Sequence, residues 1–545
     1  MGSAKDHLDV LIIGAGFCGL HTLNKLRKSG FSAKIYERSS GLGGVWQANR
    51  YPGARVDIET PAYQLSDKEL WQDFDWGERY PGRSELLRYF NHVDKKLGLS
   101  KDIEFNTTVV SSRFDESRQL WCVKTDTGLS TSTWAKYFIL CTGFTCTKYI
   151  PEYKGLDKFK GIWHHSALWP EDTVDLTGKR VAVVGTGASG VQIIQTIGPH
   201  VSHLTVYQRT PNMALPMRQC SSSDEKINDG TKWTFPKKDE YERIFQKMRT
   251  TFAGIRVDFT PQKFQDATPS ERRALYEDIW AYGGFSFWLA NYIQTLFDQE
   301  ANDEAYGFWC EKTRARIHSE EKKELLAPMK PVHAWGTKHP SLEQSYYEVF
   351  NQDNVDIIDV RESPIIEMTE TGIRTEKEGV IDFDVIILAT GFDTRTGGML
   401  NIDIRNGQGK SIQQHWENGI RSYLGMMTNS FPNLFWCYGQ HSPAAFSNGP
   451  HCGEVQGDWI TELLLNMRET GREVVEAEKG SEDAWGKNIK EMWHASLYPK
   501  TESLYQGNNI PGRKPEPIYY FGGIPAYVAA LKNSKVNNYQ GFDFK

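Results

Sequence analysis

Residues 8–19 read Leu-Asp-Val-Leu-Ile-Ile-Gly-Ala-Gly-Phe-Cys-Gly, and they decide the fold. A short apolar run enters the spacing Gly14-x-Gly16-x-x-Gly19, and residues 21–28 then carry a helical pattern. The first two glycines let the backbone turn and approach a pyrophosphate, and the third lets helix and strand pack closely. The helix N-terminus offers free amides to the phosphate charge. The stretch therefore predicts a dinucleotide-binding unit.

The same architecture returns further along the chain. An apolar strand is expected at residues 180–184, and it leads into Gly185-x-Gly187-x-x-Gly190 and a helical pattern up to residue 197. Two such units in one chain imply two bound dinucleotides.

The position 23 residues after the first glycine differs between the two units. In the first unit it is Glu37, at the end of a second strand, where a carboxylate accepts hydrogen bonds from a ribose diol. In the second it is Gln208, and Arg209 and Thr210 follow at once. A carboxylate would repel a 2′-phosphate, whereas a guanidinium and a hydroxyl bind it by charge-assisted hydrogen bonds. NADPH is therefore favoured over NADH, and the alternative is that Arg209 is a solvated surface arginine.

Length and composition favour a multidomain protein that acts on small molecules. A chain of 545 residues exceeds the size at which single cores stop growing. A net charge of -6 offers no polybasic patch for nucleic acid or a membrane surface. The eight cysteines form no CxxC pair and no apolar signal region opens the chain, so we expect reduced thiols, a cytoplasmic location and no metal site. Nothing in the sequence indicates an oligomeric state.

Residues 221–325 have a different character. Charged runs alternate there with aromatic and aliphatic residues at helical spacing, as in residues 285–297. We interpret the charges as a solvated face and the aromatics as core, and we assign no chemistry to either. The pattern predicts an α/β fold with two dinucleotide-binding domains and a helical insertion.

Four more motifs lie between and after the two units. They are Gly43-Gly44-Val45-Trp46 continuing to Tyr51-Pro52-Gly53-Ala54-Arg55-Val56-Asp57, Phe159-x-Gly161-x-x-x-His165-x-x-x-Trp169-Pro170, Gly336-Thr337-Lys338-His339, and Ala389-Thr390-Gly391-Phe392-Asp393. The second resembles the fingerprint of the type I Baeyer–Villiger monooxygenases, and the others agree with that family, the third only in part. These flavoenzymes use NADPH and dioxygen to turn ketones into esters or lactones.

The resemblance implies two Rossmann-like domains. The FAD-binding domain would comprise residues 1–149 and 386–545, and the NADPH-binding domain residues 150–220 and 326–385, with the helical insertion at 221–325. It also implies that a C4a-peroxyflavin formed from reduced FAD and dioxygen attacks the ketone.

The resemblance also assigns roles to single residues. Gly44 and Trp46 would lie along the flavin, and Asp57 would reach the active site as the partner of a cation, although a turn-capping carboxylate is the ordinary interpretation. Lys338 would be a second cation at the NADPH phosphate. Ala445 and Phe446 lie in the loop that lines the family's substrate pocket, and simple packing is the alternative for Phe446.

The chain departs from the family at His339. The family has an arginine there that stabilises the flavin peroxide anion, whereas histidine titrates near an unperturbed pKa of about 6.5. If Asp57 lies beside His339, the carboxylate favours the imidazolium and partly restores the cation. A neutral His339 would instead favour oxygenation of sulfides or amines, or release of hydrogen peroxide as an NADPH oxidase. An inert packing role is the remaining alternative.

A second departure is Leu504, where the family commonly has tryptophan in a loop that closes over NADP. Leucine keeps the apolar contact but loses the indole donor, which weakens cofactor retention. Two other classes are kept as alternatives. A disulfide reductase is disfavoured because no CxxC follows the first unit, and a non-catalytic nucleotide sensor would bind FAD but oxidise no NADPH.

Overall fold

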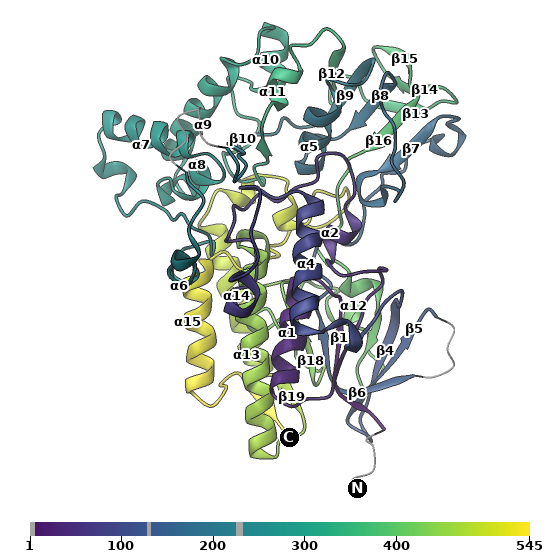
Figure 1. Cartoon of the computed structure of the whole chain (residues 1–545), viewed down its shortest axis with the longest axis vertical. Coiled ribbons are helices and arrows are strands. Elements are labelled where there is room, and N and C mark those ends of the chain that lie inside the picture. Colours follow the sequence, from purple (N-terminus) through teal and green to yellow (C-terminus); the bar gives the residue numbers. More distant parts are fainter. Residues whose placement is uncertain (1–5, 128–131, 225–232) are drawn as a thin grey trace.

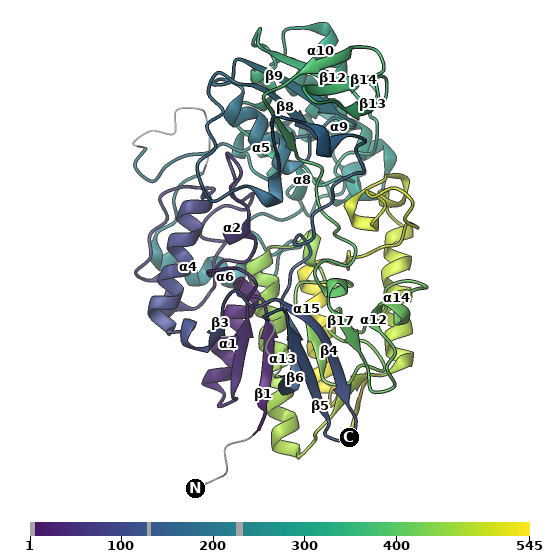
Figure 2. The same ribbon diagram turned by 90° about the vertical axis from the view of Figure 1, so that its right-hand side faces the viewer.

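The computed structural model describes residues 6–127, 132–224 and 233–545. Residues 1–5 and 128–131 of the expected FAD-binding domain and 225–232 of the expected insertion lie outside the described residues. The chain forms two halves, each built around its own sheet (Figure 1). Turned by 90°, the lower half shows its sheet standing beside long helices, with the second sheet and the insertion above it (Figure 2).

The sheet of the lower half is mixed. Its strand order is β17 (Asp403–Arg405), β4 (Val109–Asp115), β5 (Leu120–Thr125), β6 (Thr133–Leu140), β1 (Leu8–Ile13), β2 (Ala33–Tyr36) and β3 (Ile103–Glu104), and β18 (Leu434–Trp436) pairs with β6. Strand β1 runs parallel to both β2 and β6, while β5 is antiparallel to β4 and β6. The last four residues of β1 are buried, as expected for a strand covered on both faces.

Helix α1 (Phe17–Lys28) packs against α13 (Gly449–Thr470), a long helix from the C-terminal part of the chain. Two glycines of α13 permit this approach. A Cβ on Gly453 would lie 2.3 Å from the Cys18 sulfur, and one on Gly457 would lie 2.8 Å from the Thr22 hydroxyl. Asp458, which follows, lies 2.9 Å from the His21 ring. Residues more than 400 positions apart thereby build one half of the molecule.

The sheet of the upper half is entirely parallel. Its order is β12 (Val355–Asp359), β9 (His203–Gln208), β8 (Arg180–Val184), β16 (Val385–Leu388) and β7 (Ile162–His165). Helix α5 (Ala188–Ile197) follows β8, as the second glycine motif predicts. Because β16 lies in this sheet, residues 386–388 pair with the expected NADPH-binding strands, and the chain returns to the first sheet only after Leu388.

The region expected to be a helical insertion is helical and adjoins the upper half (Figure 1). Its helices are α6 (Tyr241–Met248), α7 (Pro269–Tyr282), α8 (Ser286–Leu289), α9 (Gln299–Arg314) and α10 (Glu320–Leu326). The remaining helices are α2 (Val45–Ala48), α3 (Lys68–Trp71), α4 (Arg83–Leu97), α11 (Tyr346–Val349), α12 (Ile412–His415), α14 (Lys479–His494) and α15 (Gly523–Val536). Smaller strand groups are β10 (Leu215–Pro216) with β11 (Leu342–Glu343), β13 (Ile365–Met368) with β14 (Gly372–Thr375) and β15 (Gly379–Asp382), and β19 (Val475–Ala477) with β20 (Phe542–Phe544).

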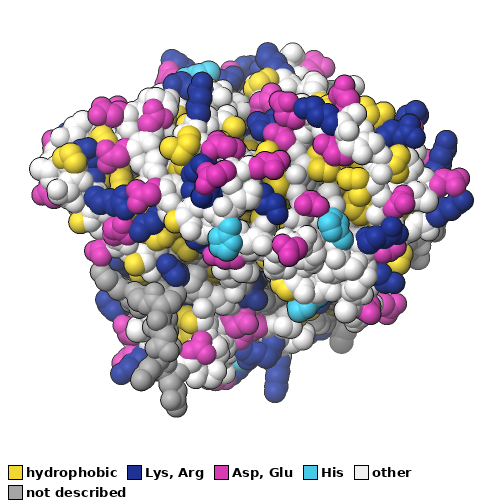
Figure 3. All heavy atoms as spheres, turned by 90° about the horizontal axis from the view of Figure 1, so that it is seen from above, with side chains coloured by type: hydrophobic (Ala, Val, Ile, Leu, Met, Phe, Trp, Pro, Cys, Tyr) yellow, Lys and Arg dark blue, Asp and Glu magenta, His cyan; other side chains and the backbone are white. Residues whose placement is uncertain are grey.

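Three further features concern the surface charge, the helices and the cysteines. The upper face in Figure 3 shows lysine and arginine side chains interspersed with aspartate and glutamate, so charge of one sign does not dominate it. In the part of the chain that is described, every helix is too short or too polar to cross a bilayer. All eight cysteines are free thiols.

Candidate active site

In the first glycine turn, Gly14 and Gly19 are closely surrounded by backbone atoms, whereas Gly16 has free space beside it. Gly14 has a φ of +104°, and a Cβ there would lie 2.5 Å from the carbonyl oxygen of Cys141. A Cβ on Gly19 would lie 1.9 Å from the Gly14 oxygen, so neither glycine can be replaced without movement. Gly16 caps the N-terminus of α1, and its Cβ would meet Gly44 only at 3.6 Å. Space is therefore kept beside the free amides of α1, where a pyrophosphate fits.

Glu37 lies at the predicted place, directly after β2, and it is buried. One of its carboxylate oxygens accepts a hydrogen bond from the Ala15 amide at 2.7 Å, and the other accepts one from the Ser39 amide at 2.7 Å. The carboxylate is thus anchored to the glycine turn itself. Its remaining lone pairs can accept hydrogen bonds from a ribose diol.

The second glycine turn repeats this geometry. Gly185 has a φ of +108°, and a Cβ there would lie 2.5 Å from the Ala389 carbonyl oxygen. A Cβ on Gly190 would lie 2.2 Å from the Gly185 oxygen. Gly187, at the N-terminus of α5, has nothing within 4 Å of its Cβ position among the described residues. Both turns therefore leave the middle glycine open toward a helix N-terminus.

Gln208, Arg209 and Thr210, at the end of β9, lie in three different environments. Gln208 is fully buried, and its amide donates to the Leu325 carbonyl at 2.7 Å, so it faces the interior. Arg209 is exposed. The Thr210 carbonyl accepts a hydrogen bond from the Thr186 hydroxyl at 2.8 Å, which ties this strand end to the glycine turn. Arg209 and Thr210 therefore lie beside the second glycine turn.

Lys338 lies in an unusually cationic environment. The pKa of Lys338 is lowered to about 8, first by burial and also by the positive charges of Arg209 and Arg361, while the charge of Glu502 opposes the shift. Arg361 is paired with Asp359 at 2.6 Å, but no described carboxylate lies within 4.0 Å of the Lys338 or Arg209 nitrogens. Lys338 and Arg209, two cations with no paired carboxylate among the described residues, suit a phosphate dianion. Sequence reasoning found Lys338 and Arg209 and missed Arg361 and Glu502, which are distant in sequence.

The segment containing Trp46 and Asp57 joins the two halves. Trp46 is buried, and its indole donates to the Tyr63 hydroxyl at 3.1 Å. The Tyr51 hydroxyl donates to the Gln192 side chain on α5 at 3.0 Å. Gly53 has a φ of +81°, and a Cβ there would lie 2.6 Å from the Gln192 carbonyl oxygen. The segment that carries Asp57 is therefore held against the helix of the second glycine turn.

Asp57 and His339, 282 positions apart, meet at the junction of the halves. The His339 Nε2 atom lies 3.7 Å from an Asp57 carboxylate oxygen, which is an ion-pair distance and too long for a hydrogen bond. The edges of Phe285 and Trp288 hold the imidazole, with ring centroids 5.4 and 5.6 Å away. Burial raises the pKa of Asp57, and a positive charge on His339 opposes that rise. The pairing proposed between these two residues from the sequence is therefore present in the structure.

A small cavity opens directly beside this pair. The space between its lining atoms amounts to about 250 Å³, part of which is open solvent. Its lining residues are Asp57, Ile58, Glu59, Tyr80, Ile255, Val257, Tyr282, Gly283, Phe285 and Ser286. Six of these ten residues come from the region 221–325, to which we assigned no chemistry from the sequence. We interpret the apolar residues of that region as core from their helical spacing, and this spacing does not indicate that some of them face a cavity.

Glu59 connects the cavity wall to a buried charge. Its carboxylate lies 2.8 Å from the guanidinium of Arg79, which is 0% exposed. The Tyr282 hydroxyl donates to the same carboxylate at 3.0 Å. Arg79 also donates to the Tyr282 carbonyl at 3.0 Å. This cluster joins the loop that follows Asp57 to the end of α7 in the insertion.

Ala445 and Phe446 belong to a short 3₁₀ turn that is not part of the cavity wall. Ala445 is half-buried, and Phe446 is 5% exposed. The Phe446 ring stacks on Tyr505 with centroids 4.4 Å apart and meets Phe521 edge-on at 5.0 Å. In this structure Phe446 packs in an aromatic group that includes the C-terminal segment.

His165 of the predicted fingerprint lies at the point where the chain changes halves. Strand β7 pairs with β16, placing His165 opposite Leu388. The His165 side chain accepts a hydrogen bond from the Ala167 amide at 3.1 Å and meets the Phe392 ring edge-on. Burial lowers the pKa of His165 to about 4, so it is neutral at ordinary pH. His165 therefore lies at the end of β7, and neither Asp57 nor His339 is among its contacts with the described residues.

Comparison with known proteins extends these observations. Residues 7–215 match the family model described as flavin-binding monooxygenase-like. Cyclopentanone 1,2-monooxygenase of Comamonas sp. (strain NCIMB 9872) is 45% identical over 540 residues, which cover 99% of this chain and 96% of that protein. The structure of cyclohexanone monooxygenase from Rhodococcus sp. Phi1 bound to NADP⁺ has a TM-score of 0.93 and 32% identity, with 99% of this chain and 100% of that chain covered. A complex of OTEMO with FAD and NADP has a TM-score of 0.92 and 32% identity, covering 99% of both chains.

Proposed function

The chain belongs to the type I Baeyer–Villiger monooxygenases, which are FAD- and NADPH-dependent enzymes that oxidise ketones, and we propose that His339 and Asp57 supply the charge at its active site. The overall reaction consumes a ketone, dioxygen, NADPH and a proton, and yields an ester or lactone, NADP⁺ and water. Its atoms balance because one oxygen atom enters the product and the other leaves as water. The observation that carries the assignment of the charge is the ion pair between two motifs at the junction of the halves.

The two dinucleotide sites fit their cofactors. At the first, the open Gly16 and the carboxylate of Glu37 would hold FAD, with Gly44 and Trp46 beside the flavin. At the second, Gly187 leaves room for a pyrophosphate, and Lys338 and Arg209 would bind the 2′-phosphate of NADPH. Bound FAD, once reduced by NADPH, supplies the electrons that activate dioxygen.

His339 would act as a preorganised cation. The Asp57 carboxylate lies 3.7 Å from its Nε2 atom, and the rings of Phe285 and Trp288 pack against the imidazole. A positive charge held in this place would stabilise negative charge that develops on oxygen as the ketone is attacked. An arginine at the same position would supply the same charge.

We propose a small, mostly apolar ketone as the substrate, and a cyclic ketone in particular. The cavity beside the ion pair has Ile58, Ile255, Val257 and Phe285 in its wall, and these apolar side chains suit an apolar ligand. The similarity to cyclopentanone 1,2-monooxygenase over 99% of this chain supports a ring substrate. Ala445 and Phe446 would reach such a substrate only after a change of the aromatic group around Tyr505.

The test is oxidation of cyclopentanone and of a linear ketone by the FAD-loaded protein under isotopically labelled dioxygen. We expect lactone carrying one labelled oxygen, with product formed in proportion to NADPH consumed. Oxidation of NADPH that yields only hydrogen peroxide with both ketones, together with oxygenation of an aryl sulfide, would overturn the proposed function.

We also propose the division of the chain described by the sequence, with the return to the FAD-binding domain placed after Leu388 of β16. The pairing of β16 with β7 and β8 supports that position.

We further propose a reducing, cytoplasmic location, which the free state of all eight cysteines supports.

A further inference from the structure

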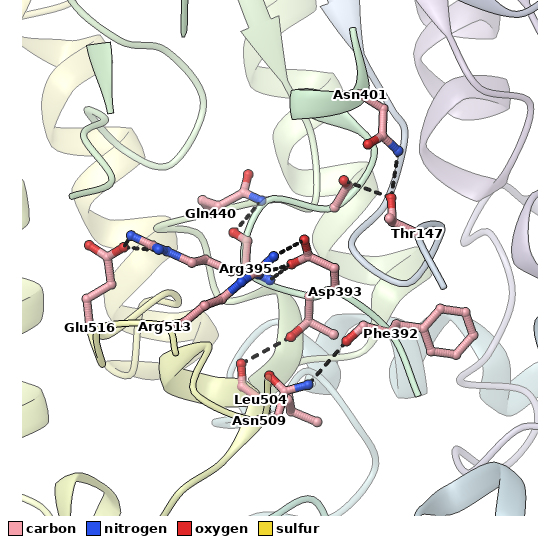
Figure 4. A network of polar contacts seen from close by, with 12 residues as sticks. Thr147, Phe392, Asp393, Arg395, Asn401, Gln440, Leu504, Asn509, Arg513 and Glu516 are labelled. Carbon is pink, nitrogen blue, oxygen red and sulfur yellow. Dashed lines mark hydrogen bonds and ion pairs between the residues drawn. The ribbon is translucent and has the colours of Figure 1, made fainter. Parts of the chain in front are cut away.

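A four-residue turn, residues 392–395, follows β16 where the chain crosses between the halves; we call it the crossover turn. It binds a distant part of the chain, residues 498–516, which we call the closing segment. Figure 4 shows the two side by side, with charged side chains from each pointing toward the other. The sequence singled out the crossover turn only as part of a family motif, and Asp393 has no part in the active site described above.

Two ion pairs join these elements. Asp393 accepts hydrogen bonds from both terminal nitrogens of Arg513, at 2.5 and 2.7 Å. Arg395 pairs with Glu516, whose other carboxylate oxygen accepts from the Ile420 amide at 3.0 Å. The Asp393 side chain is 16% exposed and that of Arg513 is 29% exposed, so the pair is sheltered from solvent. A bidentate, sheltered pair holds its partners more firmly than an exposed surface pair.

Neutral hydrogen bonds reinforce the contact along the whole turn. The Thr394 hydroxyl donates to the Leu504 carbonyl at 3.2 Å, and the Asn509 side chain donates to the Phe392 carbonyl at 3.2 Å. The Tyr519 hydroxyl, just beyond the closing segment, donates to the Thr394 carbonyl at 2.8 Å. The crossover turn is therefore contacted at every position from Phe392 to Arg395.

The other end of the closing segment reaches the proposed NADPH site. The Tyr498 hydroxyl donates to the Gly336 carbonyl at 3.1 Å, and the hydroxyls of Thr501 and Thr337 are 2.8 Å apart. The charge of Glu502 acts on Lys338, the lysine proposed to bind the phosphate. One segment thus spans the distance from the crossover turn to the residues that precede His339.

We propose that Asp393 and Arg513 form a latch that positions the closing segment over the NADPH site and so retains the oxidised cofactor during turnover. The proposal rests on the proposed function for its meaning in the reaction. Releasing the latch frees the segment to move, and its contacts with Gly336, Thr337 and Lys338 are then made at an entropic cost. Leu504 lacks an indole donor, so in this chain the segment depends on contacts with protein rather than on that donor.

The test uses the FAD-loaded full-length variants Asp393→Asn, Arg513→Gln and the double variant. The matched control is Asp403→Asn. Asp403 lies on β17 of the first sheet, its side chain is 48% exposed, and it pairs with Arg405 at 2.9 Å. We expect the Kd for NADP⁺ and the KM for NADPH to rise about tenfold in each single variant, the effect of losing one charge-assisted interaction. The expected kcat changes little, and the fraction of NADPH that ends as hydrogen peroxide increases.

Two additional readouts separate a latch from general damage. Trypsin cleaves after Arg513 but not after Lys514, because Pro515 follows, so Asp393→Asn should accelerate cleavage at Arg513 and the control should not. The double variant should be no worse than either single variant, since one interaction is lost only once. If Asp393→Asn does not fold, Arg513→Gln on the half-buried segment gives the same comparison of Kd and peroxide.

The proposal is overturned if NADP⁺ binding and the peroxide fraction in the latch variants match those of the control, or if the two single effects add in the double variant. These outcomes differ from failure of the proposed function. A parent enzyme that forms no ester from any ketone would contradict the proposed function, while cofactor binding and cleavage at Arg513 would still test the latch.

Discussion

The pKa of Lys338 leads to a quantitative prediction for cofactor binding. Burial lowers that pKa to about 8, with the charges of Arg209 and Arg361 acting in the same direction. A lowered lysine pKa means that the charge is present below about pH 8 and is lost as the pH rises through that value. A phosphate binds the charged form, so raising the pH weakens NADPH binding.

The size of the effect follows from the titration. With a pKa of about 8, about 90% of Lys338 is charged at pH 7 and about 10% at pH 9. If the charged form carries the 2′-phosphate interaction, the KM for NADPH rises about tenfold between these two pH values. The replacement Lys338→Arg keeps its charge at both, so its KM should stay nearly constant.

The assay is steady-state NADPH oxidation with saturating ketone at pH 7, 8 and 9, with NADH as the matched cofactor. NADH lacks the 2′-phosphate, so its KM should not follow the titration of Lys338. A parallel rise of the KM for NADH, or an equal rise for NADPH in Lys338→Arg, would refute the assignment of Lys338 to the phosphate.

Three further predictions concern the framework of the site. Gly187→Ala should leave the melting temperature unchanged, because nothing described lies within 4 Å of the new Cβ, but it should raise the KM for NADPH about tenfold; an unchanged KM would contradict the placement of the pyrophosphate. Gly53→Ala should lower the melting temperature more than Gly98→Ala. Both changes add left-handed backbone strain of about 1–2 kcal/mol, but only the Cβ at residue 53 would also meet Thr196, at 2.3 Å. Equal shifts by calorimetry would argue against the contact between the halves. Glu59→Gln should lower the free energy of unfolding by about 3–5 kcal/mol, because Arg79 would be left buried without its charged partner. Glu370→Gln, in an exposed pair with Lys160, should shift the denaturation midpoint far less, and similar midpoints for the two variants would refute the prediction.

Local patterns in the sequence predicted the two glycine turns and their strands because each is built from neighbouring residues. Gly14 and Gly185 adopt φ values above +100°, which glycine tolerates and other residues rarely do. Glu37 ends its strand as expected. The acid position also separated the two units, since Arg209 is exposed beside the second turn, whereas Gln208 is buried.

Contacts between distant segments could not be predicted in the same way. The closing segment meets the crossover turn through Arg513 and Asp393, 120 positions apart, and neither residue lies in a periodic pattern. Ile255, Val257 and Phe285 are apolar residues of the insertion, and nothing in their local pattern predicts that they line a cavity. Only the position of the insertion against Asp57 shows it. The meeting of Asp57 with His339 was expected only because a resemblance joined two motifs that no local rule connects.

The central claim is that a positive charge at residue 339, beside Asp57, supports ester formation. The most direct measurement is a balance of ester and hydrogen peroxide per NADPH consumed for the parent, His339→Arg and His339→Ala, with NADPH supplied well above its KM. The account predicts a high ester yield in the parent and in His339→Arg, and a loss of ester to peroxide in His339→Ala. An ester yield in His339→Ala equal to that of the parent, or a yield that falls as far in His339→Arg as in His339→Ala, would contradict it.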